Sequence, residues 1–299
     1  MPPSRTSAGR VLVIGDVMVD IIVRAEGPLV PGSDRRASIQ SRQGGSAANQ
    51  AVWLARFGVE TDFVGRVAEE DRAAQAAIFR NAGVSPILSG DAKLPTGRLV
   101  AIVDAAGERS FLTDRGANDG LSPGDIPLDR LAGASLVHLS GYSFVAEGPR
   151  AAARAAIARA RELSIPVSVD PASTAFLLEI GAARFLEWIA GASIIFPNAA
   201  EAAVLTALAD DDAQTDALAA LFPLVVVKRG AAGAEAAAGA ARWRRLADPA
   251  VAIDSTGAGD AFVAGFLASW LGGAAHQDSL ARAVAAGGLA TQAVGGRPA

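Results

Sequence analysis

The chain has 299 residues, of which 51% are hydrophobic and 19% are charged. This length and composition are typical of an α/β protein with a large core and exclude a disordered chain. A net charge of −4 gives no indication of a nucleic-acid partner, and the absence of cysteine excludes disulfides, thiolate catalysis and cysteine-based zinc sites. No apolar run reaches the roughly 20 residues of a membrane span, and residues 1–10 do not resemble a signal peptide, so we expect a cytoplasmic protein without a membrane partner.

The first 120 residues predict strands and helices in an irregular order. Arg10 to Gly15 predicts a buried strand that continues to Val23, and Ser46 to Phe57 predicts a helix that ends before Gly58. The other elements expected here are a strand at 61–64, a helix at 71–81, and a hairpin of strands 98–103 and 108–113 around a turn at 104–107. The segments at about 20–42 and 95–115 predict antiparallel β-pieces that form a small sheet beside the main one.

From about residue 120 onward, predicted strands and helices alternate. Such alternation is typical of a parallel sheet that is covered by helices on both faces. The expected strands are 135–140, 167–170, 193–196 and 224–228, and the expected helices are 149–163, 182–189, 199–208, 258–271 and 279–293. We therefore expect a single α/β domain over residues 1–299.

A glycine turn followed by an acid is the most informative motif in the chain. Gly257, Ala258 and Gly259 lead into an apolar helix whose first turn contains Asp260. The free N–H groups of such a helix start suit an anion, and a neighbouring carboxylate can act as the base for phosphoryl transfer to a hydroxyl. The chain has no Gly-Lys pair, which excludes a P-loop, and Phe262 stands where the dinucleotide fingerprint needs glycine. Taken alone, an ordinary helix start with an acid in its first turn is an equally good interpretation.

Two more segments place polar residues at helix starts. Gly44 and Gly45 precede a helix that carries Asn49, and paired glycines let the backbone come close to a ligand. Asn198 and Glu201 follow a predicted strand, where open α/β sheets bind ligands, and they can hold a hydrated Mg²⁺ through water. For each segment alone a structural interpretation is favoured: a glycine turn with an N-cap for the first, and a capping box for the second.

Two segments beside buried strands offer further binding groups. Asp16 and Asp20 lie around the end of the first strand, where an aspartate can accept hydrogen bonds from sugar hydroxyls. A solvated loop acid is the favoured interpretation for Asp16 and an equally good one for Asp20. Lys228, Gly230 and Gly233 follow a strand of valines, where small residues can support a purine or a ribose and the lysine can approach phosphates. A simple β-turn is favoured for this segment alone.

In their order and spacing these segments resemble the ribokinase family of carbohydrate kinases, the PfkB-type sugar and nucleoside kinases. The resemblance runs from Val11 to about Arg297, and the stretch from Asp254 to Phe262 is its most specific part. It implies a ribokinase-like three-layer α/β sandwich with a mainly parallel central sheet and a small β lid, formed by segments 20–42 and 95–115. It also implies ATP-dependent phosphorylation of a hydroxyl of a small sugar or sugar acid, ATP and Mg²⁺ as cofactors, and a homodimer formed through the lid.

The resemblance implies a role for each candidate residue. Asp260 is similar to the family's catalytic base, and the N–H groups of Gly257, Ala258 and Gly259 resemble its anion hole. The other implied roles are sugar binding by Asp20, Gly44, Gly45 and Asn49, magnesium and phosphate positioning by Asn198 and Glu201, ATP binding by Lys228, Gly230 and Gly233, and binding of a K⁺-like ion by Asp254 with the backbone around Gly295.

This chain departs from the family pattern in two places. Ala199 and Ala200 stand where the family often has a second acid, which weakens the magnesium role of this segment. Met18 stands where ribokinase itself has an asparagine, which argues against ribose as the sugar.

Three functions stay open at this point. A sugar kinase can act on a fructose-like sugar or a keto-deoxy sugar acid, whose carboxylate Arg109 and Arg115 can meet unless they are solvated arginines at a sheet edge. A nucleoside kinase needs an aromatic platform for the base, for which Tyr142 is the one candidate. A non-catalytic sugar or nucleotide sensor has no need of a base, so the presence of Asp260 argues against it.

Overall fold

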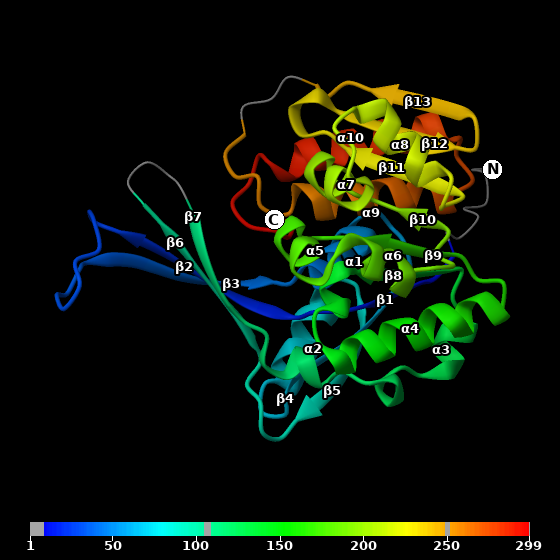
Figure 1. Cartoon of the computed structure of the whole chain (residues 1–299). Helices are drawn as coiled ribbons and strands as arrows, with labels where there is room; N and C mark the ends of the chain where they lie inside the picture. Colours follow the sequence, from blue (N-terminus) through cyan, green and yellow to red (C-terminus); the bar gives the residue numbers. More distant parts are fainter. Residues whose placement is uncertain (1–8, 105–108, 249–251, 299) are drawn as a thin grey trace, which may run out of the picture.

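The computed structural model describes residues 9–104, 109–248 and 252–298, and within these ranges its main body is a nine-stranded sheet (Figure 1). The strands are β1 (Val11–Ile14), β4 (Thr61–Ala68), β5 (Ser85–Asp91), β8 (Leu136–Ser140), β9 (Val167–Asp170), β10 (Ile194–Ile195), β11 (Leu224–Lys228), β12 (Ala234–Ala238) and β13 (Ala241–Arg245). Their order is β13-β12-β11-β10-β9-β8-β1-β4-β5, and every neighbouring pair from β5 to β11 is parallel. Only the β11–β12 and β12–β13 pairs of this sheet are antiparallel. The expected mainly parallel sheet is confirmed.

Helices cover both faces of this sheet because its strands are apolar on both sides. In β1, Val11 and Val13 enter one buried cluster, whereas Leu12 and Ile14 enter the other. The first cluster includes side chains of α1 (Ser46–Arg56), α2 (Arg72–Asn81), α9 (Ala258–Leu271) and α10 (His276–Ala290). The second includes side chains of α3 (Leu128–Ala132), α4 (Glu147–Glu162), α5 (Thr174–Ile180), α6 (Ala182–Trp188), α7 (Ala199–Thr206) and α8 (Asp211–Ala219). In the described ranges, no helix is both long and apolar enough to cross a membrane.

A second, four-stranded sheet extends away from the main body (Figure 1). Its strands are β3 (Ala37–Gly44), β2 (Met18–Ala25), β6 (Gly97–Val103) and β7 (Arg109–Asp114), in that order across the sheet. We call it the small sheet. The two outer pairs are antiparallel as expected, but the central β2–β6 pair is parallel, so the expectation of purely antiparallel pieces was wrong. Glu108 and most of the expected 104–107 turn lie outside the described residues.

Three strands of the main sheet, β5, β12 and β13, were not expected from the sequence. β5 contains a proline and a glycine, and β12 is the alanine-rich segment Ala-Glu-Ala-Ala-Ala, whose composition favours a helix. Both segments are strands because a neighbouring strand pairs with them: β4 with β5, and β11 with β12. Tertiary pairing therefore overrides local propensity at both edges of the sheet.

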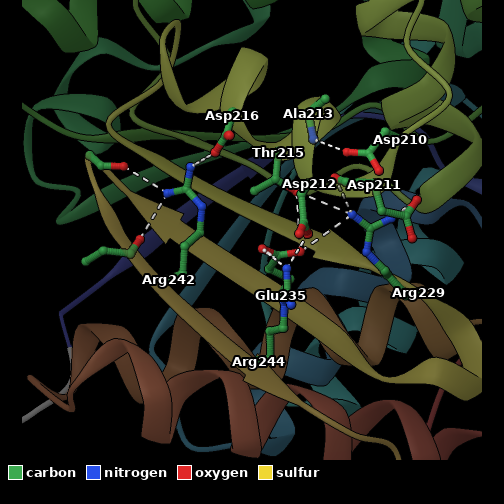
Figure 2. Close-up of polar contacts among 12 residues, drawn as sticks. Asp210, Asp211, Asp212, Ala213, Thr215, Asp216, Arg229, Glu235, Arg242 and Arg244 are labelled. Atoms are coloured by element: carbon green, nitrogen blue, oxygen red, sulfur yellow. Dashed lines mark hydrogen bonds and ion pairs between the residues drawn. The ribbon is translucent and has the colours of Figure 1, made fainter.

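Ion pairs fasten α8 to the β12–β13 hairpin and to the loop that follows β11 (Figure 2). Arg229 lies 2.7 Å from Asp211 and 3.6 Å from the buried Glu235, while Arg242 and Arg244 pair with Asp216 and Asp212 of α8. The pairs that involve the exposed acids Asp211, Asp212 and Asp216 add little free energy each, on the order of 0–1 kcal/mol. Their effect is geometric, because they hold the short loop that begins at the carboxyl end of β11.

Candidate active site

A cavity of about 410 Å³ opens where the parallel strands end. Asp170 is the last residue of β9, Lys228 is the last residue of β11, and Asn198 follows β10 at the start of α7. Carboxyl ends of parallel strands meet at one edge of a sheet, which is where open α/β sheets bind ligands. The cavity is lined by Ser46, Tyr142, Asp170, Ala172, Asn198, Glu201, Lys228, Gly230, Gly257, Gly259 and Asp260.

Asp260 lies at the start of α9, directly opposite the start of α1. The hydroxyl of Ser46 donates to Oδ1 of Asp260 at 2.8 Å, and the amide Nδ2 of Asn49 donates to Oδ2 at 3.0 Å. The pKa of Asp260 is raised to about 7, chiefly by burial and also by the nearby Asp170 carboxylate, and this value already includes the opposing effects of the hydrogen bonds from Asn49 and Ser46 and of the charge of Lys228. Each carboxylate oxygen is thus held by one donor and keeps lone pairs for a ligand.

The turn before Asp260 presents free backbone N–H groups, but not all of those expected. Gly257 has the left-handed backbone (φ 75°) that begins the helix. The N–H of Ala258 donates to the carbonyl of Ser255 at 3.2 Å, so this N–H is not free for the expected anion hole. The N–H groups of Gly257, Gly259 and Asp260 have no acceptor among the described residues. A Cβ on Gly259 would lie 3.7 Å from Nζ of Lys228, so the ammonium stands beside these donors.

A series of hydrogen-bonded, buried side chains holds Lys228 in place. Its Nζ donates to Oδ1 of Asp170 at 2.8 Å, and Oδ2 of the same carboxylate accepts from Nε2 of Gln50 at 2.9 Å. Oε1 of Gln50 lies 2.8 Å from Nε2 of His138, whose Nδ1 lies 2.8 Å from the hydroxyl of Ser168. Since the Gln50 oxygen can only accept, Nε2 of His138 carries the proton and Nδ1 accepts from Ser168.

The protonation states of these side chains agree with the donors and acceptors assigned above. Burial and the charge of Lys228 lower the pKa of His138 to about 3, so the imidazole is neutral. Burial alone would lower the pKa of Lys228, but the carboxylates of Asp170 and Glu201 outweigh it and raise that pKa, so the amine stays charged. These side chains therefore keep Lys228 charged and in place at the cavity wall.

Asn198 and Glu201 form the capping box that the sequence also permits. The N–H of Asn198 donates to Oε2 of Glu201 at 2.8 Å, and the N–H of Glu201 donates to Oδ1 of Asn198 at 2.9 Å. The pKa of Glu201 is raised to about 6, chiefly by burial; the charge of Asp170 also raises it, and the charge of Lys228 and the N–H of Asn198 act the other way. Both residues line the cavity, so a structural cap and a ligand contact are compatible.

Asp20, Gly44, Gly45 and Asn49 come together at the junction of the small sheet and α1. The side chain of Asp20 fills the space beside Gly44, where a Cβ would lie only 2.2 Å from Oδ2, so the carboxylate can approach only a glycine. Burial and the charge of Asp16 raise the pKa of Asp20 to about 6, partly offset by the charge of Arg297. Of this expected sugar-binding set, Asn49 contacts Asp260 directly.

Asp16 is not a solvated loop acid. It is buried, and its carboxylate accepts from the N–H groups of Ser46 and Ala47 at 3.1 and 3.2 Å. It supplies the cap that α1 lacks in its own N-cap residue, Gly45. The expectation for Asp16 was wrong because the acceptor and the helix start are 30 residues apart in the sequence.

Other expected residues have partners that limit their roles. Gly233 does not line the cavity: a Cβ there would lie 2.0 Å from the carbonyl of Arg245, which indicates a packing role. Arg115 donates to Asp119 and to the carbonyl of Tyr142, and the side chain of Arg109 lies outside the described part. Asp254, by contrast, accepts from the N–H of Gly295 at 3.1 Å, so these two expected neighbours do meet.

Sequence reasoning missed several residues that the fold adds to the site. Ser46 and Asp170 both carried a signal, since one is the first residue of a helix after paired glycines and the other ends a buried strand. Gln50 and His138 carried none, because both lie inside regular elements with no local sign of a polar partner. Arg297 also lies in the site, where it contacts Asn49, which is 248 residues away in the sequence.

Comparison with known proteins agrees with this geometry. The chain matches the model of the pfkB family carbohydrate kinases over residues 8–299. It is 33% identical to the ATP-dependent ribose-1-phosphate kinase of Halopiger xanaduensis over 97% of this chain and 94% of that protein, and 32% identical to a fructokinase of Klebsiella pneumoniae over 96% and 94%. The crystal structure of adenosine kinase from Sinorhizobium meliloti matches with a TM-score of 0.86 at 26% identity, over 98% of this chain and 96% of that one.

These matches confirm the ribokinase-like fold and the enzyme class that the sequence motifs implied. The family match extends over nearly the whole chain and includes the cavity, the small sheet and the helix start at Asp260. The chain belongs to the pfkB family of carbohydrate kinases, which are ATP-dependent sugar kinases.

Proposed function

We propose that this protein transfers the terminal phosphoryl group of ATP to a hydroxyl of a small sugar, with Asp260 as the base. One observation carries the proposal: the carboxylate of Asp260, oriented by Ser46 and Asn49, lies beside the unpaired N–H groups of Gly257 and Gly259. A hydroxyl that donates to this carboxylate faces a phosphoryl group bound at those amides. Phosphoryl transfer needs this positioning and charge stabilisation more than covalent help from the protein.

In the proposed reaction, each group has a separate task. Asp260 accepts the proton of the attacking hydroxyl as the new O–P bond forms and the bond to the leaving ADP oxygen breaks. The amides of Gly257 and Gly259 donate to the oxygens of the transferring phosphoryl group, and Lys228 offsets their negative charge. Asp20 and Asn49, with the close backbone at Gly44 and Gly45, hold the sugar. Gly230 and the loop after β11 support the nucleotide.

The charges of the cavity fit a magnesium–nucleotide complex. Asp170, Glu201 and Asp260 face a single described cation, Lys228, so the lining carries an excess of negative charge when all three acids are ionised. The described residues contain no group of three or more acidic or histidine side chains that could hold a metal, which agrees with Mg²⁺ as a hydrated ion on the phosphates rather than in a protein cage. Glu201 and Asn198 would hold it through water. When bound, Mg²⁺ neutralises phosphate oxygens.

A nucleoside kinase is the second candidate. Tyr142 lines the cavity together with Ser46 and Asp260, which is where a base attached to the acceptor ribose could stack. The similarity to an adenosine kinase supports the same alternative. Measuring ADP release with neutral sugars, sugar phosphates, sugar acids and nucleosides as acceptors separates the two. A cytoplasmic location and a K⁺ site at Asp254 stay predictions.

Replacing the base tests the proposal most directly. We expect Asp260→Asn to lower turnover by roughly 10²–10⁴-fold, because a bare hydroxyl is a poor nucleophile without proton transfer. ATP affinity, measured by calorimetry, should stay within a few-fold. Asp278→Asn, which changes an exposed acid in the first turn of α10, is the matched control. Turnover at the wild-type rate in Asp260→Asn would rule out this base.

The pH dependence of kcat/KM should report the same group. Since burial raises the pKa of Asp260 to about 7 in the free enzyme, and only the ionised carboxylate can accept a proton, kcat/KM should fall as the pH decreases through 7. The Ser46 hydroxyl lowers this pKa, so Ser46→Ala should move the acidic limb to higher pH. A limb that stays in place in Ser46→Ala would assign the titration to another group.

Asp170 is proposed to position Lys228 for the phosphates. In Asp170→Asn the amide cannot accept from both Lys228 and Gln50, so the ammonium loses its anchor. We expect the KM for ATP to rise about tenfold or more, with a much smaller change in the KM for sugar. Asp211→Asn, which removes an exposed partner of Arg229, is the control. Tighter ATP binding in Asp170→Asn would mean that Asp170 competes with the nucleotide instead.

The small sheet is proposed to form a homodimer contact. On the face opposite Asp20, the strand register aligns a patch of Ile21, Val23, Ile39, Val100, Ile102 and Leu112. Ile39 and Leu112 are 64% and 63% exposed, and a patch of this kind on a soluble enzyme is typical of an interface. We expect Ile39→Arg with Leu112→Arg to shift the mass in sedimentation from dimer to monomer, whereas Leu128→Arg on α3 leaves it unchanged. A monomeric wild type would exclude this contact.

A further inference from the structure

The side chain of Arg297 lies inside the proposed sugar site although it comes from the far end of the chain. Its Nε donates to Oδ1 of Asn49 at 3.2 Å, and its Nη2 donates to the carbonyl of Gly44 at 3.2 Å. Both partners belong to the set proposed to hold the sugar.

The backbone that carries Arg297 is fixed. Nε1 of the buried Trp53 donates to the carbonyl of Gly296 at 2.9 Å, and the N–H of Gly295 donates to Asp254. Gly296 is therefore held by α1, and Gly295 is held by the turn before α9. The guanidinium of Arg297 is presented to the site by a rigid support rather than by a free tail.

No carboxylate of the described residues lies within ion-pair distance of Arg297. Its two hydrogen bonds go to neutral oxygens. Three of its five N–H donors have no described acceptor. Burial lowers the pKa of Arg297 to about 10, while the more distant Asp20 and Asp260 act the other way, so it remains charged at neutral pH. Its guanidinium also lies over the ring of Phe79, 5.3 Å from the ring centroid, which offsets part of the cost of burial. A partly buried cation without an ion pair still gains from a ligand that supplies an anion.

A second arginine stands nearby. Arg42 is the direct cross-strand neighbour of Asp20 in the β2–β3 ladder, and its side chain reaches the Cα of Gly295, where an added Cβ would lie 3.5 Å away. Arg42 is exposed and donates only to Gln40 among the described residues. Two arginines, Arg42 and Arg297, thus lie near Asp20: one is its neighbour in the strand register, and the charge of the other acts on its carboxylate.

We propose that the acceptor is an anionic sugar, a sugar phosphate or a sugar acid, whose anionic group binds Arg297 with help from Arg42. The inference rests on the proposed kinase function and narrows it to a substrate class. The fork of Arg297 can meet a phosphate or carboxylate with two parallel hydrogen bonds, while Asp20 binds a hydroxyl of the same sugar. A neutral sugar would leave the guanidinium without a counter-ion.

The test compares acceptors that differ only in charge. Ribose and fructose are the neutral arm, ribose 1-phosphate and fructose 1-phosphate the phosphate arm, and gluconate the acid arm. We expect kcat/KM for one of the anionic arms to exceed that for the neutral sugars by about 100-fold. Arg297→Gln should lower that value by roughly 10- to 100-fold, the loss typical of a charge-assisted hydrogen bond. The same variant should leave the KM for ATP within a few-fold.

Two further variants keep the result interpretable. Arg297→Lys retains the charge without the fork and should recover part of the affinity, which a purely structural role for the side chain would not explain. Arg98→Gln is the matched control: Arg98 is paired in register with Val19, on the opposite face of the small sheet from Asp20. Melting temperatures of all variants identify any that fail to fold.

The outcomes separate this inference from the kinase proposal. Calorimetry with ribose 1-phosphate, fructose 1-phosphate or gluconate, each without ATP, measures anion recognition independently of turnover. Binding that depends on Arg297, in a protein that phosphorylates none of these sugars, would overturn the kinase function and leave only the recognition of an anionic sugar by Arg297. Phosphorylation of neutral sugars as efficient as that of the anionic ones, or an equal effect of Arg297→Gln on both, would overturn the anionic acceptor and leave the kinase function standing.

Discussion

The packing of α1 against α9 is the constraint on which the site depends. It brings two helix starts to one point, so that Ser46 and Asn49 of one helix hold both oxygens of Asp260 on the other. Small residues at the contact, such as Ala47, Ala51 and Ala261, are fully buried and let the two backbones approach. The N–H groups at the start of α1 are capped by Asp16, whereas those of Gly257 and Gly259 at the start of α9 have no acceptor among the described residues. The start of α9 therefore offers a place that suits anions in a cavity lined by acids.

Hydrogen bonds fix the positions and the protonation states of the charged groups in that cavity. Lys228 stays charged because Asp170 is held in place by Gln50, which in turn is oriented by a neutral His138. Asp260 instead has a pKa near neutrality, because burial is only partly offset by its two donors and by Lys228. A fixed cation and a base that titrates near pH 7 in one cavity are the combination that proton removal and phosphoryl transfer require.

Much of the fold could be predicted from local patterns. The strand predicted from Arg10 to Gly15, the helix that begins at Ala258 and the alternation after residue 120 follow from apolar periodicity and turn residues, and the structure confirms them. The predicted continuation of the first strand to Val23 was wrong, because the chain leaves the main sheet after Ile14 and begins β2 of the small sheet at Met18. The β12–β13 hairpin could not be predicted, because its alanines favour a helix and only pairing with β11 makes it a strand. The parallel β2–β6 pair was missed for a related reason: nothing local states which strands of a small sheet become neighbours.

The sequence by itself determined the chemistry of the site: a glycine turn with an acid at a helix start, paired glycines before Asn49, and polar residues at strand ends. These are local motifs, whose conformations depend on neighbours within a few residues. Only the tertiary structure decided that Asp16 caps α1 and that Arg297 reaches the sugar side. Such contacts join atoms up to 248 residues apart, and the packing of the sheet and helices, not any local pattern, sets their distance.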